Sequence, residues 1–198
     1  MSKSVEAKVL AKIKKKPRGT IFFVENFANI SNTKAIHKAL ERLVKSEELE
    51  RVATGIYVRP IIDPYIGKVL PSIEEIAVAI AKRDRAKIVP TGSYAMYKLG
   101  LTTQLPLNIV FYSDTSARKI KIGKQSIVFK KASSKNLAFV GEISTLAIQA
   151  LRKIGKDQVT VEEINHIKNI LKNENPKHLQ HDLLLAPVWI RKLLTINE

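Results

Sequence analysis

The chain contains no cysteine among its 198 residues, which excludes a disulfide framework and any zinc site built on thiolates. This absence favours a reducing compartment, so we expect a cytoplasmic protein. Long apolar runs are also missing, because Lys, Asp, Pro or Asn interrupts each one before it reaches the length that spans a bilayer. The N-terminal segment has no apolar stretch of the signal-peptide kind, and we expect no membrane partner.

Acidic residues are scarce relative to basic ones. The sequence has 34 Lys and Arg residues against 18 Asp and Glu residues, with a formal net charge of +16 and a pI near 10.0. A nucleic acid is therefore the leading candidate partner, because neutralising phosphates releases condensed counterions and favours binding before any base is contacted. Basic proteins of the ribosome or of membrane surfaces share this composition, so charge alone leaves those classes open.

The first sixty residues predict the order helix, strand, helix, helix, hairpin. Apolar residues at helical spacing predict a helix over residues 4–16 that stops at Pro17, and a β-prone run follows at residues 21–23. Residues 24–30 predict a second, short helix or turn. A helix from about residue 32 to 46 buries Ile36, Leu40, Leu43 and Val44 on one face, and two short strands around Gly55 predict a β-hairpin. This order is typical of a winged helix-turn-helix.

The helix over residues 32–46 carries polar side chains opposite its apolar face. In a helix-turn-helix this outer face enters the major groove, where Asn pairs with adenine, Lys donates to guanine and Thr serves either hydrogen bonds or a thymine methyl. The predicted base contacts are Asn32, Thr33, Lys34, His37 and Lys38. The predicted contacts to the DNA backbone, which position the protein without specifying sequence, are Lys15, Lys16, Arg18, Ser31, Arg51, Thr54 and Arg59.

Residues 61–70 predict a linker, because prolines and a glycine interrupt both helix and strand patterns there. The sequence thus divides into a DNA-binding domain at 1–60, this linker, and an α+β domain at 71–198. That second domain is predicted to begin with a Ser72-x-x-Glu75 capping box and a helix. It continues with strands at 87–90 and 108–112, a hairpin around Gly123-Lys124, and helices at 144–154 and 161–173. Trp189, the only tryptophan, is predicted to be a packing anchor.

A second basic surface is predicted in residues 71–198. Lys119 and Lys121 alternate with Ile120 and Ile122 along one strand, so the two lysines share a face, and Lys130 and Lys131 extend the charge nearby. Two interpretations remain open: a solvated sheet face that keeps the protein in solution, or a surface that contacts nucleic acid or a partner protein.

Enzyme alternatives find little support in the sequence. Thr91-Gly92-Ser93 has the form of the Gly-Ser turn of a nucleotidyltransferase, but the following strand has Asn108 and Val110 where paired metal-binding carboxylates would be needed, and Asp114 lies beyond the strand. His178 and His181 lie one helical turn apart, yet no cysteine or third histidine supports a metal site. We therefore expect no enzymatic activity, no cofactor and no metal.

Two stretches resemble the AbiEi-type abortive-infection antitoxins. RGTIFFVENFANISNTKAIHKALERLVKSEELERVATGIYVRP at 18–60 looks like their N-terminal winged helix, and PSIEEIAVAIAKRDRAKIVPTGSYAMYKLGLTTQLP at 71–106 resembles the segment that follows it. The resemblance covers roughly residues 4–130. It implies a transcriptional autorepressor that binds its own promoter and is the antitoxin of a type IV toxin–antitoxin pair, in which the partner toxin is nucleotidyltransferase-like and a stable complex is not required.

The sequence leads to one principal hypothesis and one alternative. The principal hypothesis is a sequence-specific DNA-binding repressor and antitoxin of a phage-defence system. The alternative is a non-catalytic nucleic-acid-binding protein whose C-terminal domain is a degenerate relative of the nucleotidyltransferase fold.

Overall fold

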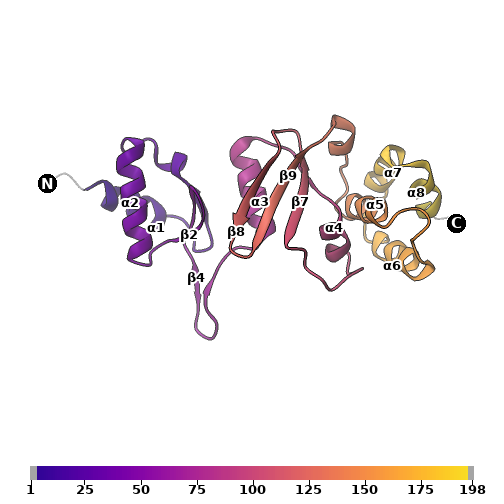
Figure 1. The fold of residues 1–198 in the computed structure, drawn as a ribbon, viewed down its shortest axis with the longest axis horizontal. Helices are drawn as coiled ribbons and strands as arrows, with labels where there is room; N and C mark the ends of the chain where they lie inside the picture. Colours follow the sequence, from indigo (N-terminus) through magenta and orange to yellow (C-terminus); the bar gives the residue numbers. More distant parts are fainter. Residues whose placement is uncertain (1–3, 196–198) are drawn as a thin grey trace. The chain divides into compact units, whose positions relative to one another are not determined.

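The computed structural model describes residues 4–195 and has an α+β fold (Figure 1), which confirms the predicted fold class at that level. The chain forms two compact units, Met1–Ile80 (unit 1) and Ala81–Glu198 (unit 2), and the division falls inside helix α3 (Ile73–Asp84). Within residues 4–195, no helix is both long and apolar enough to cross a bilayer.

Unit 1 has the predicted order of elements over its first sixty residues. They are α1 (Val5–Lys14), β1 (Ile21–Phe23), the 3-10 helix η1 (Val24–Phe27), α2 (Thr33–Lys45), β2 (Glu50–Ala53) and β3 (Ile56–Val58). The three strands form an antiparallel sheet of order β1-β3-β2. The segment predicted as a short helix or turn is η1. The hairpin β2–β3 turns at Gly55, whose φ of 72° favours glycine.

A single apolar core joins the two helices of unit 1 to its sheet. The core consists of Val9 and Ile13 from α1, Phe22 from β1, Phe27 from η1, Ile36, Ala39, Leu40 and Leu43 from α2, then Leu49 and Tyr57. The apolar spacing of both helices therefore places their buried faces as predicted. The body of unit 1 is held by this burial, because α1 and α2 are too short to be stable as isolated helices.

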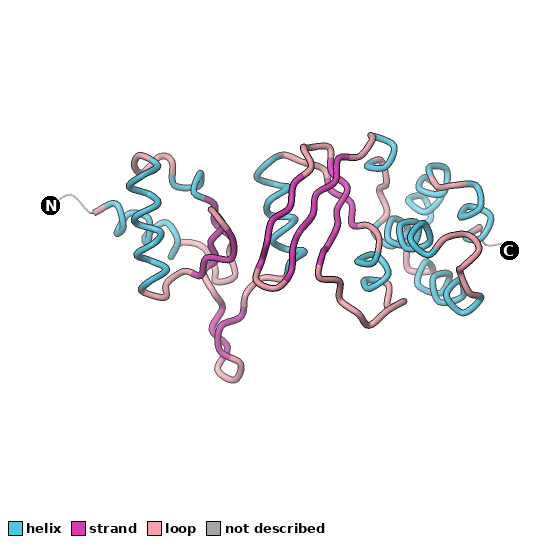
Figure 2. Tube along the Cα trace, in the orientation of Figure 1, coloured by secondary structure: helices cyan, strands magenta, loops and turns pink. Residues whose placement is uncertain are grey.

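The predicted linker at 61–70 is wrong as a description of local structure. Strands β4 (Ile61–Asp63) and β5 (Gly67–Val69) pair there as an antiparallel hairpin that projects from the rest of unit 1 (Figures 1 and 2). Asp63 Oδ1 accepts hydrogen bonds from the backbone N–H groups of Tyr65 (2.8 Å) and Ile66 (3.0 Å). This side-chain turn lets the chain reverse at Pro64, so a proline that breaks a continuous strand instead lies between two strands.

Unit 2 contains a four-stranded mixed sheet. Its strands are β6 (Ile88–Pro90), β7 (Asn108–Ser113), β8 (Arg118–Ile122) and β9 (Gln125–Lys131), in the order β6-β7-β9-β8. Strands β7 and β9 run parallel, and the other two pairs are antiparallel. The predicted hairpin is confirmed, since Ile122 pairs with Gln125 across Gly123-Lys124.

The predicted start of α3 is also confirmed. The Ser72 N–H donates to Glu75 Oε2 (2.7 Å) and the Glu75 N–H donates to Ser72 Oγ (3.2 Å), which is the reciprocal capping box. Helix α4 (Ser93–Lys98) is followed by Gly100, whose φ of 71° is the left-handed conformation that commonly terminates helices.

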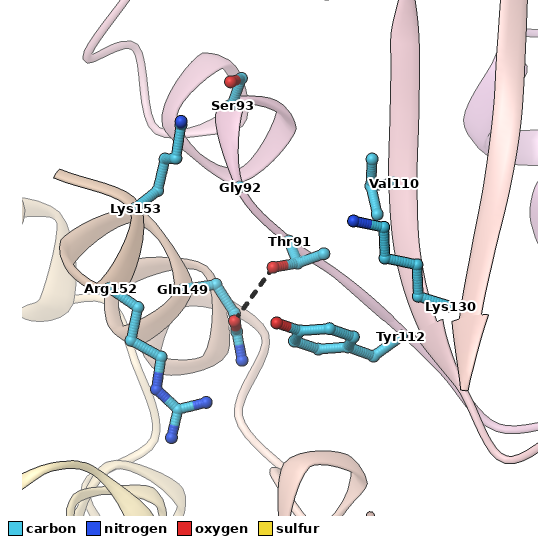
Figure 3. A pocket seen from close by; sticks show the side chains of 9 residues that line it. All are labelled: Thr91, Gly92, Ser93, Val110, Tyr112, Lys130, Gln149, Arg152 and Lys153. Carbon is cyan, nitrogen blue, oxygen red and sulfur yellow. Dashed lines mark hydrogen bonds between the residues drawn. The ribbon is translucent and has the colours of Figure 1, made fainter. Parts of the chain in front are cut away.

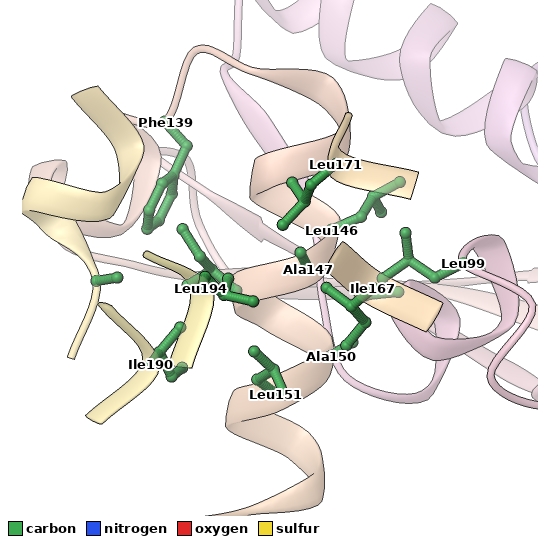
Figure 4. Packing of buried hydrophobic residues seen from close by; sticks show 13 residues of the cluster. Leu99, Phe139, Leu146, Ala147, Ala150, Leu151, Ile167, Leu171, Ile190 and Leu194 are labelled. Atoms are coloured by element: carbon green, nitrogen blue, oxygen red, sulfur yellow. The ribbon is translucent and has the colours of Figure 1, made fainter. Parts of the chain in front are cut away.

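The rest of unit 2 is helical and packs around one central helix (Figure 4). The elements are η2 (Ser134–Leu137), α5 (Glu142–Ile154), α6 (Val161–Leu171), α7 (Pro176–Leu185) and α8 (Val188–Leu194). Every residue of α5 from Ser144 to Leu151 is buried, and α4, α6 and α8 contribute apolar side chains around it. Trp189 is half-buried against this core, as expected of a packing anchor.

The predicted start of α5 at Ser144 is wrong by two residues, and the physical reason lies far away in the sequence. Glu174 Oε2 accepts hydrogen bonds from the N–H groups of Ile143 (2.7 Å) and Ser144 (3.0 Å). Asp182 accepts from the N–H groups of Val140 and Gly141, each at 2.9 Å. These carboxylates accept hydrogen bonds from backbone N–H groups at the start of the helix, which a cap residue nearby in the sequence would otherwise satisfy.

Candidate nucleic-acid interface

Helix α2 has two chemically opposed faces. Ile36, Leu40 and Leu43 are at most 1% exposed and form part of the core of unit 1. Thr33, Lys34, His37 and Lys38, four of the predicted base contacts, are all exposed. The structure thus places these four side chains together on the outer side of the helix and near its N-terminus.

The fifth predicted base contact, Asn32, is the N-cap of α2. Its Oδ1 accepts a hydrogen bond from the Ala35 N–H at 2.9 Å. A bidentate pair with adenine needs this oxygen as the acceptor and the amide as the donor. The cap uses one of the two lone pairs of this oxygen and orients the side chain toward the Ala35 N–H, so a capped Asn32 meets a base only through its amide N–H groups and the second lone pair.

Helix α1 carries Lys8 and Lys12, and Lys15 and Lys16 follow directly after its last residue, Lys14. These two pairs of lysines line a groove of about 510 Å³ together with Ala11, Asn29 and Ile30, the last two of which lie just before α2. Lys12 Nζ crosses this groove to the Asn26 carbonyl (2.5 Å) and to Asn29 Oδ1 (3.1 Å). We predicted Lys15 and Lys16 as backbone contacts but missed Lys8 and Lys12, although the i, i+4, i+8 spacing of Lys8, Lys12 and Lys16 could have identified them.

Two predicted backbone contacts have structural partners as well. Arg18 Nη1 donates to the Pro60 carbonyl at 2.9 Å, and Arg59 Nη1 donates to the Lys16 carbonyl at 3.0 Å. These bonds join the end of α1 to the end of β3. Any test that removes either guanidinium therefore changes the local structure as well as the charge.

The hairpin β2–β3 presents two predicted contacts, and a third lies before α2. Arg51 and Thr54 are exposed, whereas Ser31 is half-buried. Beneath Arg51 the phenol of Tyr57 is buried at 2% exposure; burial raises its pKa, and the nearby Arg51 charge partly opposes that rise. Tyr57 is therefore a neutral core group, and the cation of Arg51 remains at the surface beside it.

The matching family model describes a family of unknown function, DUF6088, and covers residues 8–179. The chain belongs to the DUF6088 family. No curated protein matches it in sequence. A crystal structure of the RV2827C protein from Mycobacterium tuberculosis is similar with a TM-score of 0.47 and 13% sequence identity, over 98% of this chain and 82% of that one. A likeness of this size supports no statement about function.

Unit 2 of this DUF6088 member brings three of the four lysines of the predicted second basic surface onto one face of the sheet. Lys119 pairs with Val128 and Lys121 with Ser126, and these residues share a face of β9 with Lys130. Lys131 is the next residue along β9 and so lies on the opposite face. All four lysines are exposed.

The residues behind the enzyme alternatives have structural roles. Asp114 Oδ1 accepts from the Lys87 N–H at 3.0 Å, which braces the turn after β7, and His181 Nδ1 lies 2.9 Å from the buried Asp182. Over residues 4–195, no group of three His, Cys, Asp or Glu side chains is placed to hold a metal ion.

Proposed function

We propose that this protein is a sequence-specific, double-stranded DNA-binding repressor whose residues 1–60 form a winged helix-turn-helix. The observation that carries the proposal is the geometry of α2, whose inner face is buried while its outer face holds Thr33, Lys34, His37 and Lys38. The three-stranded sheet ends in the hairpin β2–β3, which takes the place of the wing. A helix of this kind fits the major groove, and its N-terminal side chains reach base edges.

The base contacts in this proposal rest mainly on the four exposed side chains of α2. Asn32 contributes in the orientation that its helix cap imposes, through its amide N–H groups and the remaining lone pair of its oxygen. The lysines on and directly after α1 supply phosphate contacts, since Lys15 and Lys16 lie in the same groove as Lys8 and Lys12, next to the residues that precede α2. Arg51 and Thr54 supply contacts from the hairpin.

We further propose that the repressor is an antitoxin that controls its own promoter. This part rests on the resemblance of residues 18–60 and 71–106 to AbiEi-type antitoxins. It predicts a neighbouring gene for a nucleotidyltransferase-like toxin. Expression of that toxin should stop growth of the host cell, and co-expression of this protein should restore it. Unrestored growth, with both proteins present in the cell, contradicts the antitoxin proposal and leaves DNA binding untouched.

The DNA-binding proposal is tested by separating recognition from folding. We expect Lys34→Ala, His37→Ala and Lys38→Ala to keep the thermal midpoint, because these side chains are exposed and outside the core. Each variant should lower the ratio of promoter affinity to random-duplex affinity by roughly fivefold or more, which is about 1 kcal/mol or more of discrimination. The measurements are circular dichroism melting and fluorescence anisotropy at fixed salt.

Two controls accompany this test. Lys82→Ala removes one exposed charge on α3, which is not part of the proposed winged helix-turn-helix at residues 1–60, and should leave the affinity ratio unchanged. Leu40→Ala removes a fully buried side chain from the inner face of α2 and should cost about 2–5 kcal/mol of stability. If all three polar variants stay folded and keep the wild-type ratio, α2 is not the recognition element and the proposal fails.

A further inference from the structure

Unit 2 contains a cavity of about 350 Å³ beside the sheet (Figure 3). Its walls come from the turn Thr91–Ser93, the pleat of β7 at Val110 and Tyr112, the end of β9 at Lys130, and α5. The volume lies within the range of small-molecule sites, about 300–1,000 Å³, and exceeds that of a single phosphate group.

The cavity is lined by three cationic side chains and no acidic one. The cations are Lys130, Arg152 and Lys153. Lys130 and Lys153 have no ion-pair partner within residues 4–195, whereas Arg152 donates to Asn136 Oδ1 at 3.0 Å and covers the Phe139 ring. In Figure 3 the Arg152 guanidinium points away from Gly92, while the Lys153 chain extends toward Ser93. The two lysines are therefore the cations available to an anionic ligand.

One wall of the cavity holds a polar group that the fold leaves unsatisfied. Gln149 is 1% exposed, its Oε1 accepts from Thr91 Oγ1 at 3.2 Å, and its Nε2 has no hydrogen-bond partner. A buried amide donor without a partner costs free energy, and a ligand acceptor recovers that cost when the amide, whose nitrogen is covered here, turns toward the cavity. Tyr112 also lines the cavity, and in Figure 3 its hydroxyl is directed toward Gln149.

We propose that this cavity binds a nucleoside monophosphate. The phosphate lies between Lys130 and Lys153, which line opposite sides of the cavity in Figure 3 and whose side chains turn inward to form charge-assisted hydrogen bonds with its oxygens. The uncharged part of the nucleotide lies toward Tyr112 and accepts a hydrogen bond from Gln149 Nε2. Two features set this ligand apart from inorganic phosphate, namely the volume of the cavity and the aromatic side chain beside the unpaired amide.

The inference does not rest on DNA binding by residues 1–60. It also requires no transfer chemistry. The side chains of β7 that line the cavity are Val110 and Tyr112, so no strand carboxylate faces the proposed phosphate. The phosphate instead contacts the lysine ammonium groups directly. This mode of binding does not use the pair of acidic side chains on which two-metal catalysis depends.

The test is isothermal titration of the full-length protein with AMP and GMP, with adenosine and inorganic phosphate as separate arms. We expect at least one nucleotide to bind with a Kd below about 1 mM and at least tenfold more tightly than either adenosine or phosphate. Lys130→Ala/Lys153→Ala should weaken that binding at least tenfold. Gln149→Met should weaken it about fivefold. Met fills the same volume but also removes the acceptor of the Thr91 hydroxyl, so circular dichroism melting must show that this variant is folded at the titration temperature.

The matched control is Lys119→Ala/Lys121→Ala, which also removes two positive charges. These two lysines are exposed on β8 and do not line the cavity. It should leave the nucleotide Kd within about twofold of the wild type. The proposal is overturned if neither nucleotide binds, if phosphate binds as tightly as the nucleotides, or if both double variants weaken binding equally.

Discussion

Asn32 caps helix α2 and also lies among the side chains predicted to contact bases. The residue type is compatible with both roles, since Asn is common at N-caps and common at adenine. The structure shows that the cap occupies one lone pair of the Asn32 oxygen and fixes the orientation of the side chain. The two roles are separable by substitution, because Ser keeps a cap acceptor but has no amide.

We predict that Asn32→Ala lowers the free energy of unfolding of unit 1 by about 0.5–2 kcal/mol, through loss of the bond to the Ala35 N–H. Asn32→Ser should recover most of that stability. Urea denaturation followed by far-ultraviolet circular dichroism measures both variants. Equal stability of Asn32→Ala and the wild type would contradict the cap. A stable Asn32→Ser variant that loses promoter discrimination would show that the amide itself contacts a base.

Arg18 and Arg59 illustrate the same point with charge. Both are basic residues near the predicted wing, and composition alone assigns them to phosphates. In the structure, each guanidinium donates to a backbone carbonyl that is more than forty residues away in the sequence. No local pattern contains that information, because the partner is a carbonyl that every residue has.

At the scale of elements, the N-terminus of α5 depends on two acids from another part of unit 2. Burial is the largest influence on the pKa of Asp182 and would raise it, but hydrogen bonds from Ser144, His181, Val140 and Gly141 together outweigh burial and leave the pKa below its usual value. Glu174 accepts hydrogen bonds from the N–H groups of Ile143 and Ser144. A Cβ at Gly141 would overlap Ser144 Oγ and the Glu174 carboxylate, so only glycine fits there.

We predict that this carboxylate cluster makes unit 2 sensitive to acid. The folded-state pKa of Asp182 is lowered, so its contribution is complete above the unfolded pKa of about 3.9 and is lost as pH falls through the folded value. Asp182→Ala should lower stability at pH 7 by about 1–3 kcal/mol, because it leaves buried donors unpaired. The difference from the wild type should shrink below about pH 4.

Thermal melting of both proteins between pH 3 and pH 7 checks this prediction, with buffers kept at constant ionic strength. Asp157→Ala is the control, because Asp157 is an exposed acid in the same unit. The prediction is contradicted if the difference in melting temperature between Asp182→Ala and the wild type stays constant with pH. It is also contradicted if Asp157→Ala shows the same pH dependence.

At the scale of the whole molecule, the net charge of +16 should control DNA affinity. We predict that log K for the promoter fragment falls linearly with log salt, with a slope of about −0.9 for each phosphate neutralised. Lys15→Ala and Lys16→Ala should each reduce that slope by roughly one unit and weaken all DNA sequences alike.

Fluorescence anisotropy across a salt series measures these slopes. Lys124→Ala, at the exposed turn between β8 and β9, is the matched control for loss of one charge. A flat salt response of the wild type would remove the electrostatic argument. Loss on only one DNA sequence would mean that a base contact had been taken for a phosphate contact.

We also predict that the protein transfers no nucleotide, because β7 carries no carboxylate toward the Thr91–Ser93 turn and Asp114 braces a turn instead. Incubation with labelled nucleoside triphosphates, Mg²⁺ or Mn²⁺ and transfer RNA should leave the RNA unlabelled. Labelled RNA that disappears with Asp114→Ala would overturn this prediction. The outcome is independent of nucleotide binding, which needs only the lysines and Gln149.

The sequence alone determined the elements whose signals are local. Apolar spacing located α1 and α2, and Gly123-Lys124 located the β8–β9 hairpin. Ser72 and Glu75 located the start of α3. The sequence at 108–111 contains no acidic residue, so the absence of strand carboxylates was also evident. Each of these depends on residues within a few positions of one another, so periodicity and turn chemistry were sufficient.

Only the tertiary structure decided the features that join distant residues. Helix α5 begins at Glu142 because Glu174 and Asp182, more than thirty residues later, accept hydrogen bonds at its N-terminus. The hairpin at 61–69 was missed for a different reason, because its turn is closed locally by Asp63 while Pro64 obscured the strand pattern. The cavity unites Thr91 from a turn, Tyr112 from β7, Lys130 from β9 and Gln149 from α5. Their juxtaposition follows from the parallel pairing of β7 with β9 and the burial of α5, which are contacts between segments that no local pattern specifies.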